Sequence, residues 1–415
     1  MLSQFFAPIV GGEERAVEDL ATELAARGHE VAVATLRAED TPQREEIAGV
    51  RVHRVDGLAA RLGRLFADSA RRHLPPAPDP QVVAGLRRVL SEEKPQVVHA
   101  HNWIVHSFLP LKRRSEVPLV LSLHDYSLVC ANKRLLRFGS ICDGPGPAKC
   151  LRCAAAFYGI AKGTLVAGSL MAMAPALRRR VDMYLPVSSA VADALELARR
   201  GLPFEVIPNL IPERSDNGGR GADPALLNRL PAGDFLLFLG DGSADKGVRV
   251  LLDAHAMLED PPPLVFIGRP LALAHERSRA NVHILGTWPH AAALEAVRRC
   301  SMLIVPSLVP ETFGMVALEA MTMGRPVVAA RLGGLGELVV DGETGMLVPP
   351  GHAPALRDAI AALLADPSRR EAMGRAGRER AASYSAREIV PRVERVYRLL
   401  TAAGDEVPGA VHVES

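Results

Sequence analysis

Short apolar runs alternate with amphipathic stretches along most of the chain. Runs of strand length occur at residues 31–36, 96–100, 119–123, 183–187, 235–240, 264–268, 282–285, 303–305 and 327–329. Between these runs, apolar positions recur every three or four residues. In 14–27, one face of a helix would carry Val17, Leu20, Ala21 and Leu24. Strands that alternate with helices predict parallel sheets covered by helices, and therefore an α/β fold.

The pattern divides into two series, which predicts two domains in a chain of 415 residues. It breaks at the proline pair of 208–212 and at the polar, glycine-rich stretch 214–221. We therefore predict a first domain at 1–207, a second at 208–385, and a final helix with a tail at 386–415. Two such domains facing each other would form a ligand cleft at the carboxyl ends of both sets of strands.

Composition excludes one class of partner and argues against a membrane-spanning protein. Lys and Arg total 49 against 47 Asp and Glu, and aromatic residues are only 4%, so a nucleic-acid binder is not expected. The chain opens without a basic region followed by an apolar core, so no signal peptide is predicted. Its longest uncharged run, 163–177, falls short of the roughly 20 apolar residues that a spanning helix needs. These features predict a soluble, cytoplasmic protein.

The segment 154–180 has small and apolar residues and ends in three arginines, Arg178, Arg179 and Arg180. We expect a helix packed within the first domain. The alternatives are a lid over the cleft or an interfacial helix on anionic lipid, which would make the protein peripheral at the inner membrane face.

Two carboxylates eight residues apart, Glu311 and Glu319, follow an apolar run and a Pro-Ser turn. A helix starting near Thr312 would direct its free N–H groups into the preceding loop, which favours a phosphate or diphosphate. Eight helical residues span about 12 Å, so the two carboxylates could hold opposite ends of an extended ligand. For this spacing alone, an amphipathic helix with two solvated acids remains the alternative.

Other candidate residues follow expected strands. Gly11 and Gly12 precede the first helix, where glycine allows close backbone approach to a ligand, although a simple turn has the same signature. His99 and His101 alternate along one strand and should share a face. His124 and Asp125 follow the next strand, where a packed, hydrogen-bonded histidine is the alternative to a functional one.

Four of the five cysteines, Cys130, Cys142, Cys150 and Cys153, lie within 24 residues. A Cys-x-x-Cys pair with two further cysteines is enough for a tetrahedral structural zinc site, and disulfides are rare in cytoplasmic proteins. Free thiols and redox roles remain open as alternatives. Four thiolates would leave no open position, so such a metal would not be catalytic.

Several motifs resemble one family. The run 306–321, followed by Gly324-Arg325-Pro326 and the stretches 333–337 and 341–349, resembles the carboxyl-terminal half of GT4-type glycosyltransferases, which are retaining, use nucleotide sugars and have a GT-B fold. The stretches 5–14 and 25–35 look like the family's amino-terminal signature. The resemblance covers nearly all of the chain in the right order. It implies two Rossmann-like domains across a cleft, an acceptor-side domain first, with a cysteine-rich insertion at about 126–180, and a last helix that crosses back onto it.

The resemblance also implies roles for individual residues. Glu311, His124 and Lys246 would act at the reacting sugar and the diphosphate, and Glu319 would bind the ribose hydroxyls. The remaining donor-side residues would be Gly12, Gly240, Asp241, Thr312, Phe313, Gly314 and Met315. The acceptor side would include Gly11, His101 and Asp125. No cofactor is expected for catalysis, because the family needs no side-chain nucleophile and no Asp-x-Asp sequence follows a strand.

The chain departs from the family pattern at two places. Asp241 stands where the family has an arginine, so either Arg249 or Arg269 compensates or activity is reduced. Only about five residues precede the glycine loop, so either the start lies downstream of the natural one or the first strand is short.

The donor's base and sugar stay open, as does the acceptor, which could be a lipid-linked sugar, a polysaccharide or a small natural-product scaffold. Two alternatives to the transferase also remain. One is another GT-B enzyme, such as a sugar-nucleotide epimerase or a pseudo-glycosyltransferase. The other is a non-catalytic descendant that acts as a binding partner.

Overall fold

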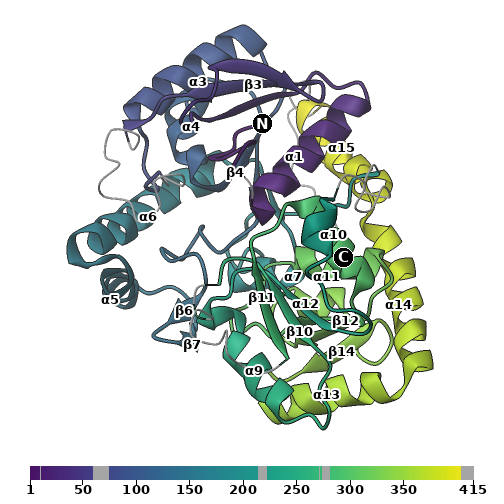
Figure 1. Ribbon diagram of the computed structural model, residues 1–415. Coiled ribbons are helices and arrows are strands. Elements are labelled where there is room, and N and C mark those ends of the chain that lie inside the picture. Colours follow the sequence, from purple (N-terminus) through teal and green to yellow (C-terminus); the bar gives the residue numbers. More distant parts are fainter. Residues whose placement is uncertain (10, 59–73, 214–221, 271, 273–280, 403–415) are drawn as a thin grey trace. The chain divides into compact units, whose positions relative to one another are not determined.

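The computed structural model describes residues 1–9, 11–58, 74–213, 222–270, 272 and 281–402. The chain forms two compact units, which we call unit 1 (Met1–Pro212 with Ala386–Ser415) and unit 2 (Glu213–Ser385). Both are α/β units (Figure 1). Two segments used in the predicted domain division lie outside the described residues. They are the stretch 214–221 and the tail from 403.

Unit 1 is built on a sheet whose halves meet at the first residues of the chain. One half has the order β1-β3-β2 and the other β4-β5-β8. The strands are β1 (Ala32–Leu36), β2 (Arg44–Ile47), β3 (Val50–Val55), β4 (Val98–His101), β5 (Leu119–Leu123) and β8 (Met183–Pro186). Leu2 forms parallel bridges to both Ala34 and Ala100, and its N–H donates to the His99 carbonyl at 2.8 Å. A short first segment therefore lies between β1 and β4, and the strand order changes direction there.

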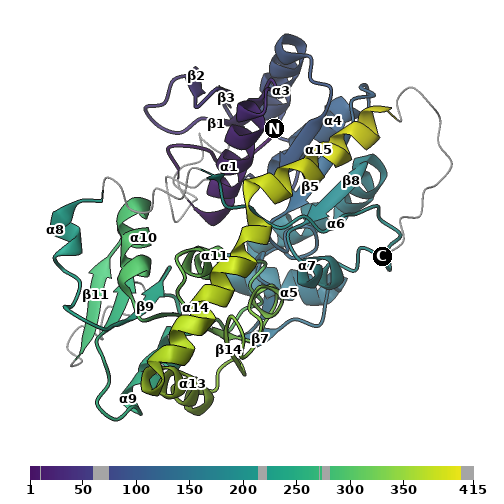
Figure 2. The same cartoon turned by 90° about the vertical axis from the view of Figure 1, so that its right-hand side faces the viewer.

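Helices cover this sheet and include the last helix of the chain. They are α1 (Gly12–Ala26), α3 (Pro80–Glu93), α4 (Val105–Lys112), α5 (Pro147–Tyr158), α6 (Ile160–Arg180), α7 (Ser189–Ala194) and α15 (Ala386–Ala402), with the hairpin β6 (Leu136–Arg137) and β7 (Ser140–Ile141). Val17 and Leu20 of α1 pack in one core with Val33, Ile389 and Val393. The last helix thus returns to unit 1, as expected, and lies against α1 (Figure 2).

Unit 2 has a six-stranded sheet in the order β11-β10-β9-β12-β13-β14, and all neighbouring strands are parallel. Its strands are β9 (Leu236–Leu239), β10 (Leu264–Ile267), β11 (Val282–Gly286), β12 (Met302–Val305), β13 (Val327–Ala330) and β14 (Gly345–Val348). Its helices are α8 (Pro224–Leu227), α9 (Val248–Ala256), α10 (His290–Arg299), α11 (Met315–Thr322), α12 (Leu335–Leu338), α13 (Ala353–Ala365) and α14 (Pro367–Ala381). Strands buried on both faces explain why the sequence shows continuous apolar runs here.

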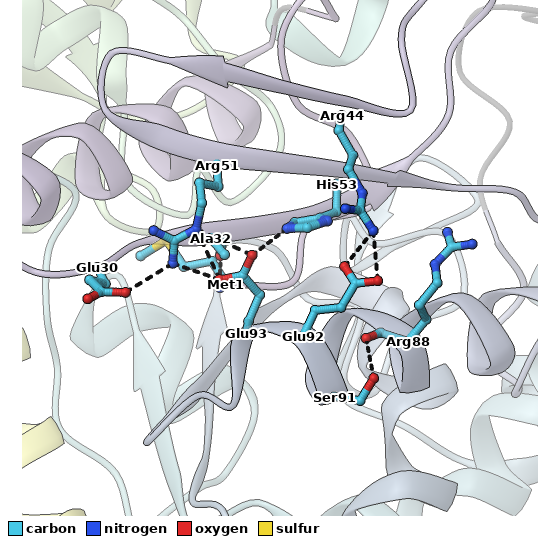
Figure 3. Close-up of polar contacts among 10 residues, drawn as sticks. All are labelled: Met1, Glu30, Ala32, Arg44, Arg51, His53, Arg88, Ser91, Glu92 and Glu93. Atoms are coloured by element: carbon cyan, nitrogen blue, oxygen red, sulfur yellow. Dashed lines mark hydrogen bonds and ion pairs between the residues drawn. The ribbon is translucent and has the colours of Figure 1, made fainter.

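All nine apolar runs form strands, but strand β3 has no such run and was not predicted. Polar side chains of β3 and of the neighbouring strand β2 contact the end of α3. Arg51 Nη2 and His53 Nε2 contact the two oxygens of Glu93 at 2.7 and 2.6 Å, and Arg44 Nη2 contacts Glu92 at 2.6 Å (Figure 3). His53 and Glu93 are largely buried, and buried polar groups are tolerated when they are paired, so a strand with polar residues can lie inside the sheet.

Candidate functional site

In unit 2, the strand order reverses between β9 and β12, which are neighbours at the centre of the sheet. In open parallel sheets, ligands bind outside the carboxyl ends of the strands at such a switch point. Gly240 and Asp241 directly follow β9, and the loop 306–311 directly follows β12. The topology therefore brings together two segments that the sequence separates by about 65 residues.

Two glycines let these loops pack backbone against backbone. Gly247 has φ +73°, and a Cβ there would lie 1.9 Å from the Pro306 carbonyl oxygen. Gly333 has φ +60°, and a Cβ there would lie 2.2 Å from the Glu311 carbonyl oxygen, which accepts the Gly334 N–H at 2.7 Å. Both positions require glycine for space and for backbone conformation.

Lys246 and Glu311 form the centre of this site. The Lys246 ammonium donates to Glu311 Oε1 at 2.6 Å, and Ser307 Oγ donates to the same oxygen at 2.5 Å. The Glu311 side chain is 17% exposed and that of Lys246 35% exposed. A fixed carboxylate can accept hydrogen bonds from sugar hydroxyls, and a partly exposed ammonium can bind phosphate. Ser307 was not identified from the sequence, where it reads only as part of a turn.

The helix after this loop begins later than predicted. Residue Gly314 has φ +105° and precedes Met315, the first residue of α11. The expected helix start near Thr312 is therefore wrong, because Glu311 forms a bridge with Gly333 instead. The two carboxylates are not separated by eight helical residues. The Ala317 N–H donates to the Gly314 carbonyl at 2.9 Å, so the first two amides of α11, those of Met315 and Val316, are the ones suited to an anion.

Two further predicted donor-side residues, Phe313 and Glu319, offer different groups to a ligand. The side chain of Phe313 is buried, with its ring 5.7 Å from that of Tyr384, so only its backbone could face a ligand. Glu319 lies on α11 and its Oε1 contacts His290 Nε2 at 2.8 Å. Sequence reasoning missed His290, although it stands at the start of α10, after a strand end.

Asp241 is paired with one of the two arginines that were expected to compensate for it. The Arg269 guanidinium donates to both carboxylate oxygens, with distances of 2.9 Å from Nε and 2.5 Å from Nη2. Arg249 instead contacts Asp253 at 3.2 Å in its own helix. A cation therefore stands beside Asp241, following the carboxyl end of β10, with its charge offset by that carboxylate.

In unit 1, the candidates gather around the corresponding switch point. Gly11 precedes α1, and Glu13 lies in its first turn. Asn102, which directly follows β4, donates from Nδ2 to Glu13 Oε1 at 2.7 Å, and its Oδ1 accepts the Gln4 N–H at 3.2 Å. A Cβ at Gly12 would meet nothing within 4 Å, so packing does not require glycine there. Glu13 and Asn102 were not predicted as site residues.

Glu13 has an unusual charge state. Burial, reinforced by the negative charge of Asp125, raises its pKa to about 7, while Lys133 acts in the opposite direction. Asp125 itself pairs with Lys133 at 3.5 Å. The carboxyl group of Glu13 can therefore exist in either protonation state near neutral pH.

The three histidines form a continuous buried group. The rings of His99 and His101 lie 4.3 Å apart, so they do share a face, and His101 Nδ1 contacts His124 Nε2 at 2.9 Å. Burial lowers the pKa of His124 to about 4 and that of the other two well below their usual range. All three are neutral at physiological pH. His99 is fully engaged by Tyr397 and Ser122, which is a packed role.

Two of the predicted residues of unit 1, His124 and Asp125, meet in one place, whereas Gly11 and His101 are not among the residues that line it. His124, Asp125, Glu13 and Asn102 line a single small cavity. A neutral imidazole, an amide and two carboxyl groups can exchange hydrogen bonds with hydroxyl groups without carrying net positive charge.

The predicted zinc site is not assembled. Within the part of the chain that the structure describes, no group of three or more His, Cys, Asp or Glu side chains could hold a metal ion. The thiols have other partners: Cys130 Sγ contacts Asn132 Oδ1 at 2.9 Å, and Cys150 Sγ accepts the Gly146 N–H at 3.3 Å. All four side chains are partly exposed. Zinc binding at these cysteines stays a prediction that would require the thiols to move together.

Comparison with known proteins gives matches over both units. Residues 11–210 match the family model of the glycosyl transferase 4-like domain, and residues 228–380 match that of glycosyl transferases group 1. The chain is 32% identical over 370 residues to D-inositol 3-phosphate glycosyltransferase 1 of Catenulispora acidiphila, covering 80% of this chain and 81% of that protein.

Two solved structures are similar over almost the whole chain. Sucrose-phosphate synthase from Thermosynechococcus elongatus superposes with a TM-score of 0.71 at 22% identity, covering 95% of this chain and 94% of that one. HepE of Anabaena, in complex with UDP and glucose, gives 0.66 at 20% identity, covering 95% and 97%. At this identity the likeness shows the fold alone, and the predicted GT-B fold class is confirmed.

Proposed function

Because the chain belongs to the glycosyl transferases of group 1, with a GT4-like amino-terminal domain, and is a hexosyl-transferring enzyme, we propose that it moves a sugar from a nucleoside diphosphate sugar to an acceptor hydroxyl with retention of configuration. The observation that carries this proposal is the pair formed by Lys246 and Glu311 at the switch point of unit 2. It combines a site for phosphate with a site for sugar hydroxyls.

On the donor side, Lys246 and the first-turn amides of α11 hold the diphosphate and offset the negative charge that develops as it leaves. Glu311 accepts hydrogen bonds from the sugar, and Glu319, supported by His290, accepts them from the ribose. Asp241 is held by Arg269, and the diphosphate competes with this carboxylate for the guanidinium. No resident metal or cofactor is part of this proposal.

In the transfer step, the bond between the sugar's anomeric carbon and the diphosphate oxygen breaks, and its electron pair leaves with the diphosphate. The acceptor oxygen forms the new bond from the same face, and its proton passes to a phosphate oxygen. Glu311 and Glu319 are therefore not the acid and base of a two-carboxylate glycosidase. On the acceptor side, His124, Asp125 and Glu13 orient hydroxyl groups. The acceptor, whether a lipid-linked sugar, a polysaccharide or a small molecule, is left to experiment.

The first test is nucleotide binding, measured as thermal stabilisation by UDP, GDP, TDP and ADP. A ligand at 100 times its dissociation constant stabilises the folded state by about 2.7 kcal/mol, which shifts the melting temperature visibly. We expect one nucleotide to do so, and UDP is tested first because HepE was solved with it. In Lys246→Ala, loss of a charge-assisted hydrogen bond should weaken that binding at least about tenfold.

The matched control is Arg370→Ala, which removes one positive charge from the same unit. Arg370 pairs with Asp234, before the amino end of β9, so this change lies at the opposite edge of the sheet from the site. Equal weakening in both variants would contradict the assignment of Lys246. No stabilisation by any nucleotide would favour the non-catalytic alternative instead.

Retention requires a separate test once donor and acceptor are known. The anomeric configuration of the product, read from proton coupling in its NMR spectrum, should match that of the donor. An inverted product would overturn the proposed step. Isomerised sugar nucleotide without any glycoside would support the epimerase alternative.

A further inference from the structure

Exposed apolar side chains are concentrated on one part of unit 1. Nine large hydrophobic side chains are exposed among the described residues, and six of them lie between residues 138 and 171. These six are Phe138, Ile141, Phe157, Ile160, Leu165 and Met171. Ile160 is 81% and Leu165 63% exposed, which is an unfavourable state in water for side chains of this size. We call the part that carries them, α5, α6 and the hairpin β6–β7, the insertion surface.

Helix α6 has two different apolar sides. Of the helices in the described residues, it alone is long and apolar enough to cross a membrane. Only 28% of its most apolar 18-residue stretch is buried in the protein. Its inner side, with Val166, Ala167 and Leu170, packs into unit 1. Its outer side carries Leu165 and Met171 and contains no acidic residue. A core helix of a soluble protein would be covered on both sides.

The charge of this segment has one sign. Residues 134–180 contain eight Lys and Arg residues and one acidic residue, Asp143, which is paired with Lys149 at 2.7 Å. Basic groups lie next to exposed aromatic rings. The Arg134 guanidinium is 5.6 Å from the Phe157 ring centre, and that of Arg137 is 5.7 Å from the Phe138 ring centre.

We propose that the insertion surface docks unit 1 on a bilayer that contains anionic phospholipid. Exposed apolar side chains with basic groups beside them are the features by which interfacial helices bind such a surface. Charge complementarity selects this occupant, because the segment's surplus of positive charge matches a negatively charged headgroup layer.

The helix lies on the membrane and does not cross it. Along its inner side α6 is held against α5 so closely that a Cβ at Gly163 would lie 2.2 Å from the Ala154 carbonyl oxygen. A spanning helix would have to leave this contact and remove Val166 and Leu170 from the core of unit 1. This docking is independent of the proposed sugar transfer and of its donor site in unit 2. Figure 1 shows α5 and α6 side by side in unit 1.

The test is flotation of the full chain with vesicles of phosphatidylcholine, with and without 30% phosphatidylglycerol. We expect binding to the anionic vesicles, and weakening of it as salt is raised. Ile160→Glu/Leu165→Glu should reduce the partition coefficient at least about tenfold, because it removes two inserted side chains and adds negative charge. Arg178→Gln/Arg179→Gln should reduce it in the same direction. Arg180 is left unchanged because it donates to the Leu109 carbonyl at 3.0 Å.

Two matched controls share the chemistry but not the position. Met257→Glu/Leu399→Glu alters exposed apolar residues outside the insertion surface, and Arg87→Gln/Arg88→Gln alters an exposed basic pair on α3. Both should bind vesicles as the wild type does. Circular dichroism and melting temperature verify that every variant is folded.

Three outcomes would overturn the proposal. The first is a folded wild-type protein that binds neither kind of vesicle. The second is equal loss of binding in the controls. The third is a stable dimer in solution that Ile160→Glu/Leu165→Glu converts to monomer, which would identify a second copy of the chain as the occupant.

Discussion

The pKa of Glu13 leads to a prediction about stability that can be worked from the structure. The carboxyl group lies in a small cavity with Asp125 and accepts a hydrogen bond from Asn102. Its pKa is raised from 4.5 to about 7, so the folded state holds a proton that the unfolded chain has released between these values. Binding of this proton adds to the free energy of unfolding. The added stability is fully present below pH 4.5 and is lost as the pH rises through 7.

The size of the effect follows from the shift. Each pKa unit corresponds to 1.36 kcal/mol, so ionising Glu13 in the folded state costs at most about 3 kcal/mol. An ionised carboxylate in the first turn of α1 gains only about 0.3–1 kcal/mol from the helix dipole, so the burial penalty dominates. Glutamine keeps the acceptor oxygen for Asn102 and cannot ionise. We therefore expect Glu13→Gln to stabilise the protein by less than about 1 kcal/mol at pH 5 and by about 3 kcal/mol at pH 8.

The assay is urea unfolding of wild type and Glu13→Gln at several values between pH 5 and 8. The difference in unfolding free energy should increase with pH and level off above pH 7. Glu18→Gln, measured in parallel, removes a negative charge from the same helix and shows the general effect of that change on α1. If the Glu13→Gln difference is flat, or if this variant is destabilised at pH 8, then the carboxylate is well solvated and the reasoning is wrong.

Three further predictions concern other sites. Gly247→Ala should destabilise the protein by more than about 2 kcal/mol in urea unfolding, because its Cβ would collide with the Pro306 carbonyl oxygen at positive φ; a smaller loss would mean that the loop relaxes. The pKa of His124 is lowered to about 4, so the free energy of unfolding should fall by about 3 kcal/mol as the pH drops from 6.5 to 4. His124→Asn should remove this loss. If the variant keeps the pH profile of the wild type, the ring is not buried in its neutral form. If the cysteines do ligate zinc, as their spacing predicts, fresh protein should carry about one equivalent that Cys150→Ser/Cys153→Ser loses; metal-free protein would leave the thiols as the structure has them.

Much of the fold could be predicted because most of its strands are apolar throughout. Buried parallel strands must carry apolar residues on both faces, so each run is visible without knowledge of its neighbours. Strand β3 shows the limit of this reasoning. Its polar residues gave no strand signal, and the contact with Glu93 on α3 is what pairs the buried His53, while Arg51 beside it is partly exposed. Glu93 lies about 40 residues away from both in the sequence.

The candidate site divides in the same way. Residues that could serve it were identified from local signals, such as glycine loops at strand ends and carboxylates near a helix start. The contacts between them were not. Lys246 and Glu311 meet because β9 and β12 are neighbours in the sheet, and Glu13 meets Asn102 because α1 and β4 converge at the switch point of unit 1.

The sequence by itself therefore determined most of the strands and helices, though not β3, and which residue types stand at their ends, since periodicity and turn chemistry are local properties. Only the tertiary structure decided that α11 begins at Met315, that Arg269 pairs with Asp241, and that Glu13 shares a cavity with Asp125 in which its pKa is raised. The physical reason is that strand order, burial and charge pairing depend on segments far apart in the chain, and no local pattern of residues records which of them will be neighbours.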